Sequence, residues 1–268
     1  MRFYPDERFC ATGCTACGAC EEACPAGAVI RSPDGVPERF LSSCIGCGHC
    51  AVYCPSNCYA LVDPLNEACS SDSFADLLAR RRSCRFFRPD PLSAEDLDRL
   101  LSVVGYSPTG KNAGGLLIRV VNGREAVQDL LGSVQRLIRI ASISGLPQLA
   151  ARIGGLRDVL SRLRSGEDLL FREAPTVLFF HVSRGNVMWK TDGVIAATYV
   201  MAHAETMGVS TLWNGFAEFL YPLIRRWHTA ETRGTRLSAV LCAGYPSRKP
   251  LWELPPRDFS TVVMDEEQ

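Results

Sequence analysis

Cysteine side chains near the start of this chain carry the clearest chemical signal in the sequence. Residues 14–25 read CTACGACEEACP, and residues 44–55 repeat the pattern as CIGCGHCAVYCP. Each copy places four cysteines with two, two and three residues between them and a proline directly after the fourth. Three thiolates of one tight loop can meet three irons of a cubane cluster, while the next turn carries the fourth away. The spacing therefore predicts two [4Fe–4S] clusters.

The fourth cysteine of each copy is expected to bind the cluster of the other copy, as this spacing does in two-cluster modules. The first cluster would be held by Cys14, Cys17, Cys20 and Cys54. The second would be held by Cys44, Cys47, Cys50 and Cys24. Zinc is the alternative, but zinc favours two separated C-x2-C pairs around one tetrahedral ion. Four other cysteines are expected to be small buried or half-buried side chains: Cys58, Cys69, Cys84 and Cys242.

Charge and hydrophobicity limit the class of protein. The 29 acidic and 29 basic residues balance, so no global field attracts nucleic acid or an anionic membrane. The first residues, MRFYPDERFC, lack the apolar region of an export signal. No run reaches the ~18 apolar residues of a membrane-spanning helix. We therefore expect a cytoplasmic protein that binds neither nucleic acid nor a membrane.

The composition changes after the cysteine-rich region. Residues 1–68 resemble a whole two-cluster bacterial ferredoxin, with the repeat as its internal twofold symmetry. A segment this short has little core, so the clusters are expected to stabilise its fold. Residues 63–73, DPLNEACSSDS, have the polar composition of a linker. Residues 74–268 are expected to form a second domain.

The second domain is expected to mix helices with a few strands. Apolar periodicity predicts helices over 74–82, 93–104 and 192–208, and two more within 127–165 that are broken near 144–147. Strands are predicted over 116–121, 176–182 and 237–245, with a short one in STLWNGF at 210–216. The 192–208 helix is apolar on nearly every face, so we expect it to be buried. Without regular βαβ alternation, this pattern indicates an α+β domain.

One basic stretch in this domain suits a phosphate group. The stretch is RRRSCRFFRP at 80–89, directly after a predicted helix. Arg81, Ser83 and Arg85 alternate, so an extended segment would point them the same way. Two guanidinium groups and a hydroxyl on one spot suit a phosphate monoester. The alternative is a solvated basic face.

Two further stretches offer polar groups to a ligand. In SPTGKNAGG at 107–115, Thr109 and Asn112 can hydrogen-bond a polyol or a heteroaromatic ring, although the stretch can also be a simple loop. STLWNGF runs from a strand into Asn-Gly, where exposed backbone N–H groups can face a cofactor. Neither a P-loop nor a G-x-G-x-x-G turn after a strand is present, so a Rossmann nucleotide site is unsupported.

In this order the stretches resemble the nitroreductase family of FMN-dependent oxidoreductases, over residues 74–263. RRSCRFF is similar to the family's phosphate motif, SPTGKN to its Pro-Ser/Thr-x-x-Asn motif and STLWNGF to its flavin-facing strand. GYPSRKPLWELPPR at 244–257 is similar to its C-terminal signature. A ferredoxin module ahead of such a domain is the arrangement of ferredoxin-type nitroreductases. The resemblance implies an α+β fold, with a bacterial-ferredoxin-like module followed by an FMN-binding domain.

The resemblance also assigns residues to the cofactor. It implies that the FMN phosphate is held by Arg81, Arg82, Ser83, Arg85 and Arg257. It implies that Asn214 and Gly215 present backbone N–H groups near flavin N5. A third set would reach the flavin of a partner subunit: Pro108, Thr109, Gly110 and Asn112. A homodimer with FMN at the subunit interface is therefore expected.

The chain departs from many relatives directly after Asn112. It reads Ala113, Gly114, Gly115 where they have Gln and then a bulky residue two and three positions on. This departure suggests a roomier or more mobile mouth of the substrate pocket. Substrate contacts at these positions do not carry over.

These features predict an FMN-dependent oxidoreductase that passes electrons from two [4Fe–4S] clusters to FMN and reduces a nitro, quinone or similar electron-poor small molecule. The electron donor would be reduced ferredoxin or NAD(P)H. The alternatives are a reductase of an enone or a halogenated aromatic ring, and a non-catalytic electron-transfer or redox-sensing flavoprotein. No side chain stands out as an acid or base, and His181, His203 and His228 are expected to be packing or surface residues.

Overall fold

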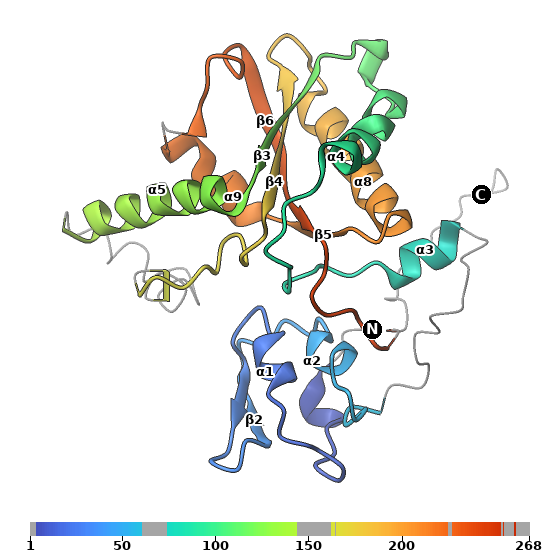
Figure 1. Cartoon of the computed structure of the whole chain (residues 1–268), viewed down its shortest axis with the longest axis vertical. Helices are drawn as coiled ribbons and strands as arrows, with labels where there is room; N and C mark the ends of the chain where they lie inside the picture. The colour runs from blue at the N-terminus through green and yellow to red at the C-terminus, as the bar shows by residue number, and fades with distance from the viewer. Residues whose placement is uncertain are drawn as a thin grey trace, which may run out of the picture. The chain divides into compact units, whose positions relative to one another are not determined.

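The computed structural model describes residues 4–60, 74–143, 162–163, 165–224, 227–252, 254 and 260. The chain divides into two compact units (Figure 1). The cysteine unit comprises Met1–Arg80 and Lys249–Gln268, and the sheet unit comprises Arg81–Arg248. The end of the chain thus groups with the cysteine unit, whereas the sequence predicts it in the second domain. The expected linker at 63–73 and Cys69 lie outside the described residues.

The cysteine unit is built from short elements. In chain order they are a 3-10 turn Pro5–Glu7, α1 Ala19–Glu22, β1 Val29–Arg31, β2 Pro37–Phe40, α2 His49–Val52 and α3 Phe74–Arg80. β1 and β2 form an antiparallel pair. Gly18 and Gly48 precede α1 and α2 with φ of 78° and 72°, a left-handed conformation that glycine adopts without steric cost. The two cysteine copies therefore share one local geometry.

The sheet unit contains a four-stranded antiparallel sheet in the order β3-β4-β6-β5. The strands are β3 Leu116–Asn122, β4 Thr176–Ser183, β5 Ser210–Trp213 and β6 Thr235–Gly244. All four lie where the sequence predicts strands. Seven of the eight residues of β4 are buried, because a central strand has both of its faces covered.

Helices cover both faces of this sheet (Figure 1). They are α4 Ala94–Leu101, α5 Arg124–Ile143, α8 Trp189–Thr206 and α9 Gly215–Leu220, with 3-10 turns at Ser102–Tyr106, Gly110–Asn112 and Tyr221–Leu223. One core joins α5 and α9 to the sheet, and the other joins α4 and α8 to it. Ser93 caps α4 by accepting a hydrogen bond from the Asp96 N–H at 3.0 Å. The predicted break near 144–147 lies outside the described residues.

The prediction that the helix at 192–208 is buried on nearly every side is wrong. Ala196, Ala197 and Val200 of α8 are fully buried. Thr198 and Tyr199 are exposed, and Tyr199 retains 39% of its accessible surface. One side of α8 packs on the sheet, whereas its other side, which includes Thr198 and Tyr199, stays at the surface of the single chain.

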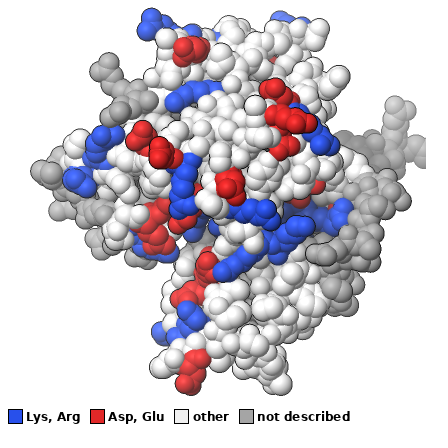
Figure 2. Space-filling view, in the orientation of Figure 1, with Lys and Arg blue, Asp and Glu red and all other residues white. Residues whose placement is uncertain are grey.

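The surface carries both signs of charge. Figure 2 shows acidic and basic side chains interspersed on one face, in keeping with the balanced composition. Among the helices in the described part of the chain, none is long and apolar enough to cross a membrane.

Candidate functional site

The eight cysteines of the two copies surround two cavities. The first, of about 320 Å³ and open to solvent, is lined by Cys14, Cys17, Cys20 and Cys54. The second, of about 330 Å³, is lined by Cys24, Cys44, Cys47 and Cys50. The fold thus brings together the two sets that the spacing predicts, with the fourth cysteine exchanged between copies. In the described residues, no three His, Cys, Asp or Glu side chains converge as they would around a single metal ion.

The fourth cysteine of each copy is held in the same way. The Ala28 N–H donates to the sulfur of Cys24 at 3.2 Å, and the Cys58 N–H donates to the sulfur of Cys54 at 3.4 Å. Backbone N–H donors of this kind stabilise negative charge on a ligating sulfur. Cys58 itself is buried, as are Cys84 and Cys242 of the sheet unit. The local geometry therefore suits thiolates bound to an iron cluster.

Burial disfavours the ionised form of two of these thiols, those of Cys20 and Cys50. Burial raises the pKa of Cys20. Burial also raises the pKa of Cys50 far above its usual range, and the neighbouring Cys47 and Cys24 raise it further. Because thiolates are the ligand form, the positive charge of bound iron is what favours their deprotonation here. The chemistry of the eight donors fits two iron–sulfur clusters.

The basic stretch at 80–89 is extended after α3, as its alternation requires. The N–H of Cys84 donates to the carbonyl of Thr211 on β5 at 2.9 Å, which ties the stretch to the sheet. Cys84 is buried, whereas Arg81, Ser83 and Arg85 are all half-buried. Alternate side chains thus face the core, and the other three point away from it together.

Arg81 has a polar atom that lacks a partner. Its Nη1 is buried and has no hydrogen-bond partner among the described residues. A buried donor without a partner is costly, so an anionic oxygen at this point would be well bound. Neighbouring side chains are held in place: Arg82 Nη1 donates to the Arg81 carbonyl at 2.9 Å, and Arg85 Nη1 donates to the Ser83 carbonyl at 3.1 Å. The stretch fits a phosphate better than a solvated face.

Sequence reasoning missed a further cation at this place, Arg172. Arg172 is half-buried in the loop before β4 and has a left-handed φ of 55°. The Asp168 carboxylate shapes this loop by accepting the N–H groups of Phe171 and Glu173 at 2.8 and 2.9 Å. Burial lowers the pKa of Arg172, and the positive charge of nearby Arg85 lowers it further. No sequence signal indicates Arg172, because it is far from Arg85 along the chain.

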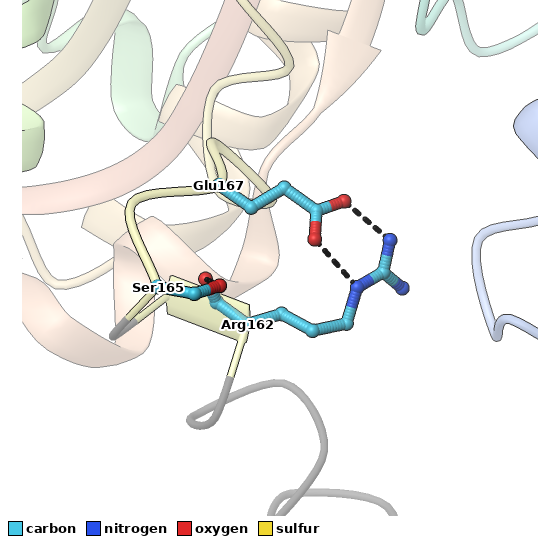
Figure 3. Close-up of polar contacts among 3 residues, drawn as sticks. All are labelled: Arg162, Ser165 and Glu167. Atoms are coloured by element: carbon cyan, nitrogen blue, oxygen red, sulfur yellow. Dashed lines mark hydrogen bonds and ion pairs between the residues drawn. The ribbon is translucent and has the colours of Figure 1, made fainter.

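The acidic residues near Arg172 form hydrogen bonds or ion pairs with other groups. Glu167 forms a two-pronged ion pair with Arg162, with Nε and Oε2 at 2.7 Å (Figure 3). Asp168 is committed to backbone N–H groups. In the part of the chain that the structure describes, no hydrogen bond or ion pair joins Arg172 to another residue. The guanidinium groups of Arg85 and Arg172 thus place two neighbouring positive charges in this region.

The loop at 107–115 is fixed by a buried carboxylate that the sequence did not indicate. Both carboxylate oxygens of Asp192, on α8, accept the Gly110 N–H at 3.0 Å. Asn186 donates to the same carboxylate at 2.7 Å, which leaves Asp192 fully hydrogen-bonded although it is buried. The Thr109 hydroxyl accepts the Gly114 N–H at 3.0 Å. These bonds hold the loop in one conformation.

The tip of this loop faces solvent in the single chain. Pro108 and Asn112 are exposed, and Thr109 and Gly110 are half-buried. Asn112 has a left-handed φ of 54°. The four predicted residues therefore lie together on one turn that projects from the chain.

Asn214, directly after β5, uses most of its polar groups in hydrogen bonds within the fold. Its N–H donates to the Val240 carbonyl at 2.8 Å, so this amide belongs to the sheet. Its side chain accepts the Ala217 N–H at 2.9 Å and donates to the Leu170 carbonyl at 2.8 Å. Asn214 thus positions the start of α9 and the loop that carries Arg172. Of the two amides expected to face a cofactor, only that of Gly215 lies beyond the sheet hydrogen bonds.

Of the three histidines singled out in the sequence, His181 is buried, His203 is half-buried and His228 is exposed. Burial lowers the pKa of His181 to about 4, and the charges of Arg119 and His228 lower it further. His203 and His228 contact the carbonyls of Leu100 and Tyr221. Arg257, expected at the phosphate, lies outside the described residues.

The sheet unit matches the model of a known protein family. Residues 78–245 match the model of the nitroreductase family, which is more than half of the 268 residues. The chain belongs to the nitroreductase family. In this family member, residues 13–59 also match the model of a 4Fe-4S dicluster domain, and all eight cysteines of the two cavities fall in that range. The match indicates iron–sulfur clusters in the cysteine unit.

Solved structures support the fold of this nitroreductase-family chain. A nitroreductase with bound FMN from Bacteroides fragilis is 17% identical, with a TM-score of 0.58, over 73% of this chain and 100% of that one. A nitroreductase with bound FMN from Desulfitobacterium hafniense is 19% identical, with a TM-score of 0.55, over 71% and 98%. Iodotyrosine deiodinase bound to FMN and 3-iodo-L-tyrosine is 20% identical, with a TM-score of 0.51, over 72% and 99%. The comparison with curated proteins found no similar sequence.

Proposed function

We propose that this chain is an FMN-dependent oxidoreductase that receives electrons through two [4Fe–4S] clusters and reduces an electron-poor small molecule, such as a nitro compound or a quinone. One observation carries the proposal: eight cysteines line two cavities in the same chain as a nitroreductase-family domain. When bound, FMN exchanges electrons singly with one-electron carriers and in pairs with organic substrates. It would thus connect one-electron clusters to a two-electron reduction.

The FMN phosphate would be bound by Arg81, Ser83 and Arg85, and we add Arg172 to this set. Two observations support the assignment: the buried Nη1 of Arg81 has no hydrogen-bond partner among the described residues, and the half-buried Arg172 lies near Arg85. Arg82 and Arg257 are proposed on the family resemblance alone. The Gly215 N–H would face the flavin ring, with Asn214 holding the turn through its hydrogen bonds to Leu170 and Ala217.

A homodimer would complete the flavin site. The turn from Pro108 to Asn112 would reach the flavin of the partner subunit, and Asp192 would keep this turn in place. Exposed apolar side chains support burial of this region in a second copy. Tyr106 is 82% exposed, Val187 is 88% exposed, and the Met188 side chain lies directly against Gly110. Patches of this kind commonly mark protein interfaces.

The electron donor would be a reduced ferredoxin or NAD(P)H. Reduced ferredoxin delivers single electrons, which a cluster accepts directly, whereas NAD(P)H delivers a hydride to a flavin. The two iron–sulfur sites of this chain favour the protein donor.

Metal and flavin analysis of anaerobically purified protein tests the assignment first. We expect about eight irons and one FMN per chain, since each four-cysteine cage holds four irons. Zinc in place of iron would contradict the cluster assignment.

Turnover then tests the activity. The protein is supplied with reduced ferredoxin or with NAD(P)H, and a panel of nitroaromatics, quinones, enones and halogenated aromatics is offered. We expect reduction of nitroaromatics or quinones. Turnover of halogenated aromatics or enones alone would select another substrate class. Full cofactor content without turnover of any member would indicate an electron-transfer or sensing role.

A further inference from the structure

The C-terminal segment of the chain packs on the second cysteine copy. The Leu251 N–H donates to the carbonyl of Val52, the last residue of α2, at 3.0 Å. The indole N–H of Trp252 donates to the carbonyl of Cys54 at 2.8 Å. Both contacts lie inside the cysteine unit, which includes Lys249–Gln268. The segment thus reaches the backbone of a proposed cluster ligand.

A leucine from the same segment covers the turn before α2. A Cβ placed on Gly48 would lie 2.8 and 2.9 Å from the two Cδ atoms of Leu254, so this side chain rests directly on Gly48. Gly48 lines the cavity of the second cysteine set. A side chain at this position would displace the Leu254 methyl groups and would strain the left-handed φ of 72°. We name Leu251, Trp252 and Leu254 the C-terminal cover.

The first cysteine copy has a different neighbour at the equivalent position. Gly18 faces the guanidinium of Arg31, whose Nη1 would lie 3.1 Å from a Cβ placed on Gly18. The first copy is also more open, because Cys17 is exposed whereas Cys47 is half-buried, and Cys50 is buried. Two similar sequences therefore have an ion-paired arginine beside the glycine of one turn and an apolar side chain beside the glycine of the other.

We propose that the C-terminal cover lowers the reduction potential of the cluster in the second cavity and slows its loss of iron. The inference rests on the proposed function, since it needs both clusters. Reduction adds negative charge to a cluster, and water or a nearby cation stabilises that charge. The methyl groups of Leu254 cover Gly48, which lines the second cavity, whereas the group beside the equivalent Gly18 is the guanidinium of Arg31, which is paired with Glu21. The cluster of the second cavity is therefore the harder one to reduce.

Matched variants of the anaerobic holoprotein test this cover. Leu251→Pro removes the N–H that Val52 accepts, while Leu251→Ala keeps it and trims a side chain that is already 44% exposed. Leu254→Ala uncovers Gly48 and changes no hydrogen bond. Potentials are measured by reductive titration followed by electron paramagnetic resonance, and iron loss is measured with an iron chelator.

We expect Leu251→Pro and Leu254→Ala to raise the reduction potential of the cluster in the second cavity and to leave that of the first cluster unchanged. Both variants should also lose iron faster than the wild type. Leu251→Ala should behave as the wild type. Wild-type potentials and iron loss in both Leu251→Pro and Leu254→Ala would overturn the proposal. If Leu251→Pro does not retain iron through purification, Leu254→Ala decides. A wild-type protein with FMN but without about eight irons would instead contradict the clusters of the proposed function.

Discussion

The cysteine unit and the sheet unit assemble their candidate sites in different ways. In the cysteine unit all eight proposed ligands lie between Cys14 and Cys54, and three ligands of each cavity come from a single loop. In the sheet unit the candidate flavin residues come from 81–85, 172 and 214–215, and the sheet and its loops bring them together. A site of the first kind depends on local spacing, and a site of the second kind depends on the whole fold.

The two units should respond differently when a site residue is substituted. A missing ligand in the cysteine unit removes a cluster that is expected to stabilise a small module with little core of its own. A missing contact in the sheet unit weakens cofactor binding but leaves a large core in place. We therefore expect all-or-none effects in one unit and graded effects in the other.

Loss of a proposed cluster ligand should have the largest effect. Cys47→Ala should remove the cluster of the second cavity and abolish substrate reduction driven by a protein electron donor. A small chemical reductant that reaches the flavin directly should still support turnover. Iron content and both activities are measured together. Cys10→Ala is the control, because Cys10 is exposed and lines neither cavity, and it should keep its iron. Equal protein-driven activity in Cys47→Ala and wild type would show that the clusters are not the entry route.

Loss of the phosphate cations should give a graded effect. Arg81→Ala and Arg172→Ala each remove a charge-assisted contact worth roughly 1.5–3 kcal/mol, so FMN affinity should fall by at least about tenfold in each. Affinity is measured by fluorescence titration of the flavin-free protein. Riboflavin lacks the phosphate and should bind wild type and variants almost equally. Arg88→Ala, an exposed arginine of the same stretch, should bind FMN normally. Unchanged FMN affinity in Arg172→Ala would remove that residue from the site.

Acid should weaken the sheet unit through His181. The pKa of this buried side chain is lowered to about 4 in the fold, chiefly by burial, from an ordinary value of 6.5. The unfolded chain therefore binds the proton more readily, so stability is full above pH 6.5 and falls as pH drops towards 4, by up to about 3 kcal/mol. Urea unfolding at pH 7 and pH 4.5 measures the loss. His181→Gln, which does not titrate, should lose correspondingly less stability between the two pH values.

The smallest expected effect compares the two cysteine copies directly. Ala16 has a left-handed φ of 55°, and the equivalent Gly46 has a φ of 64°. This conformation costs an alanine about 1 kcal/mol more than a glycine. Ala16→Gly should thus stabilise the cysteine unit by up to about 1 kcal/mol, and Gly46→Ala should destabilise it by a similar amount. Unfolding midpoints of the iron-loaded protein measure both, and shifts of the same sign would contradict the shared geometry.

The sequence by itself determined the strands of the sheet unit and the grouping of the cysteines. Each strand of the sheet unit falls where the β-rich runs predict it, because strand formation follows these local patterns. The cysteine sets follow from spacing, since a tight loop leaves few ways to place three thiolates. The alternation of Arg81, Ser83 and Arg85 likewise needs only an extended backbone.

Only the tertiary structure decided the features that join distant parts of the chain. Asp192 holds Gly110 across 82 positions of sequence, and Arg172 meets Arg85 through the loop that Asn214 anchors. The C-terminal cover packs on the cysteine unit although the chain reaches it only after β6. No periodicity or spacing predicts such pairs. Each partner has the local sequence context of an ordinary surface or loop residue, and only the fold brings the two together and excludes water from between them.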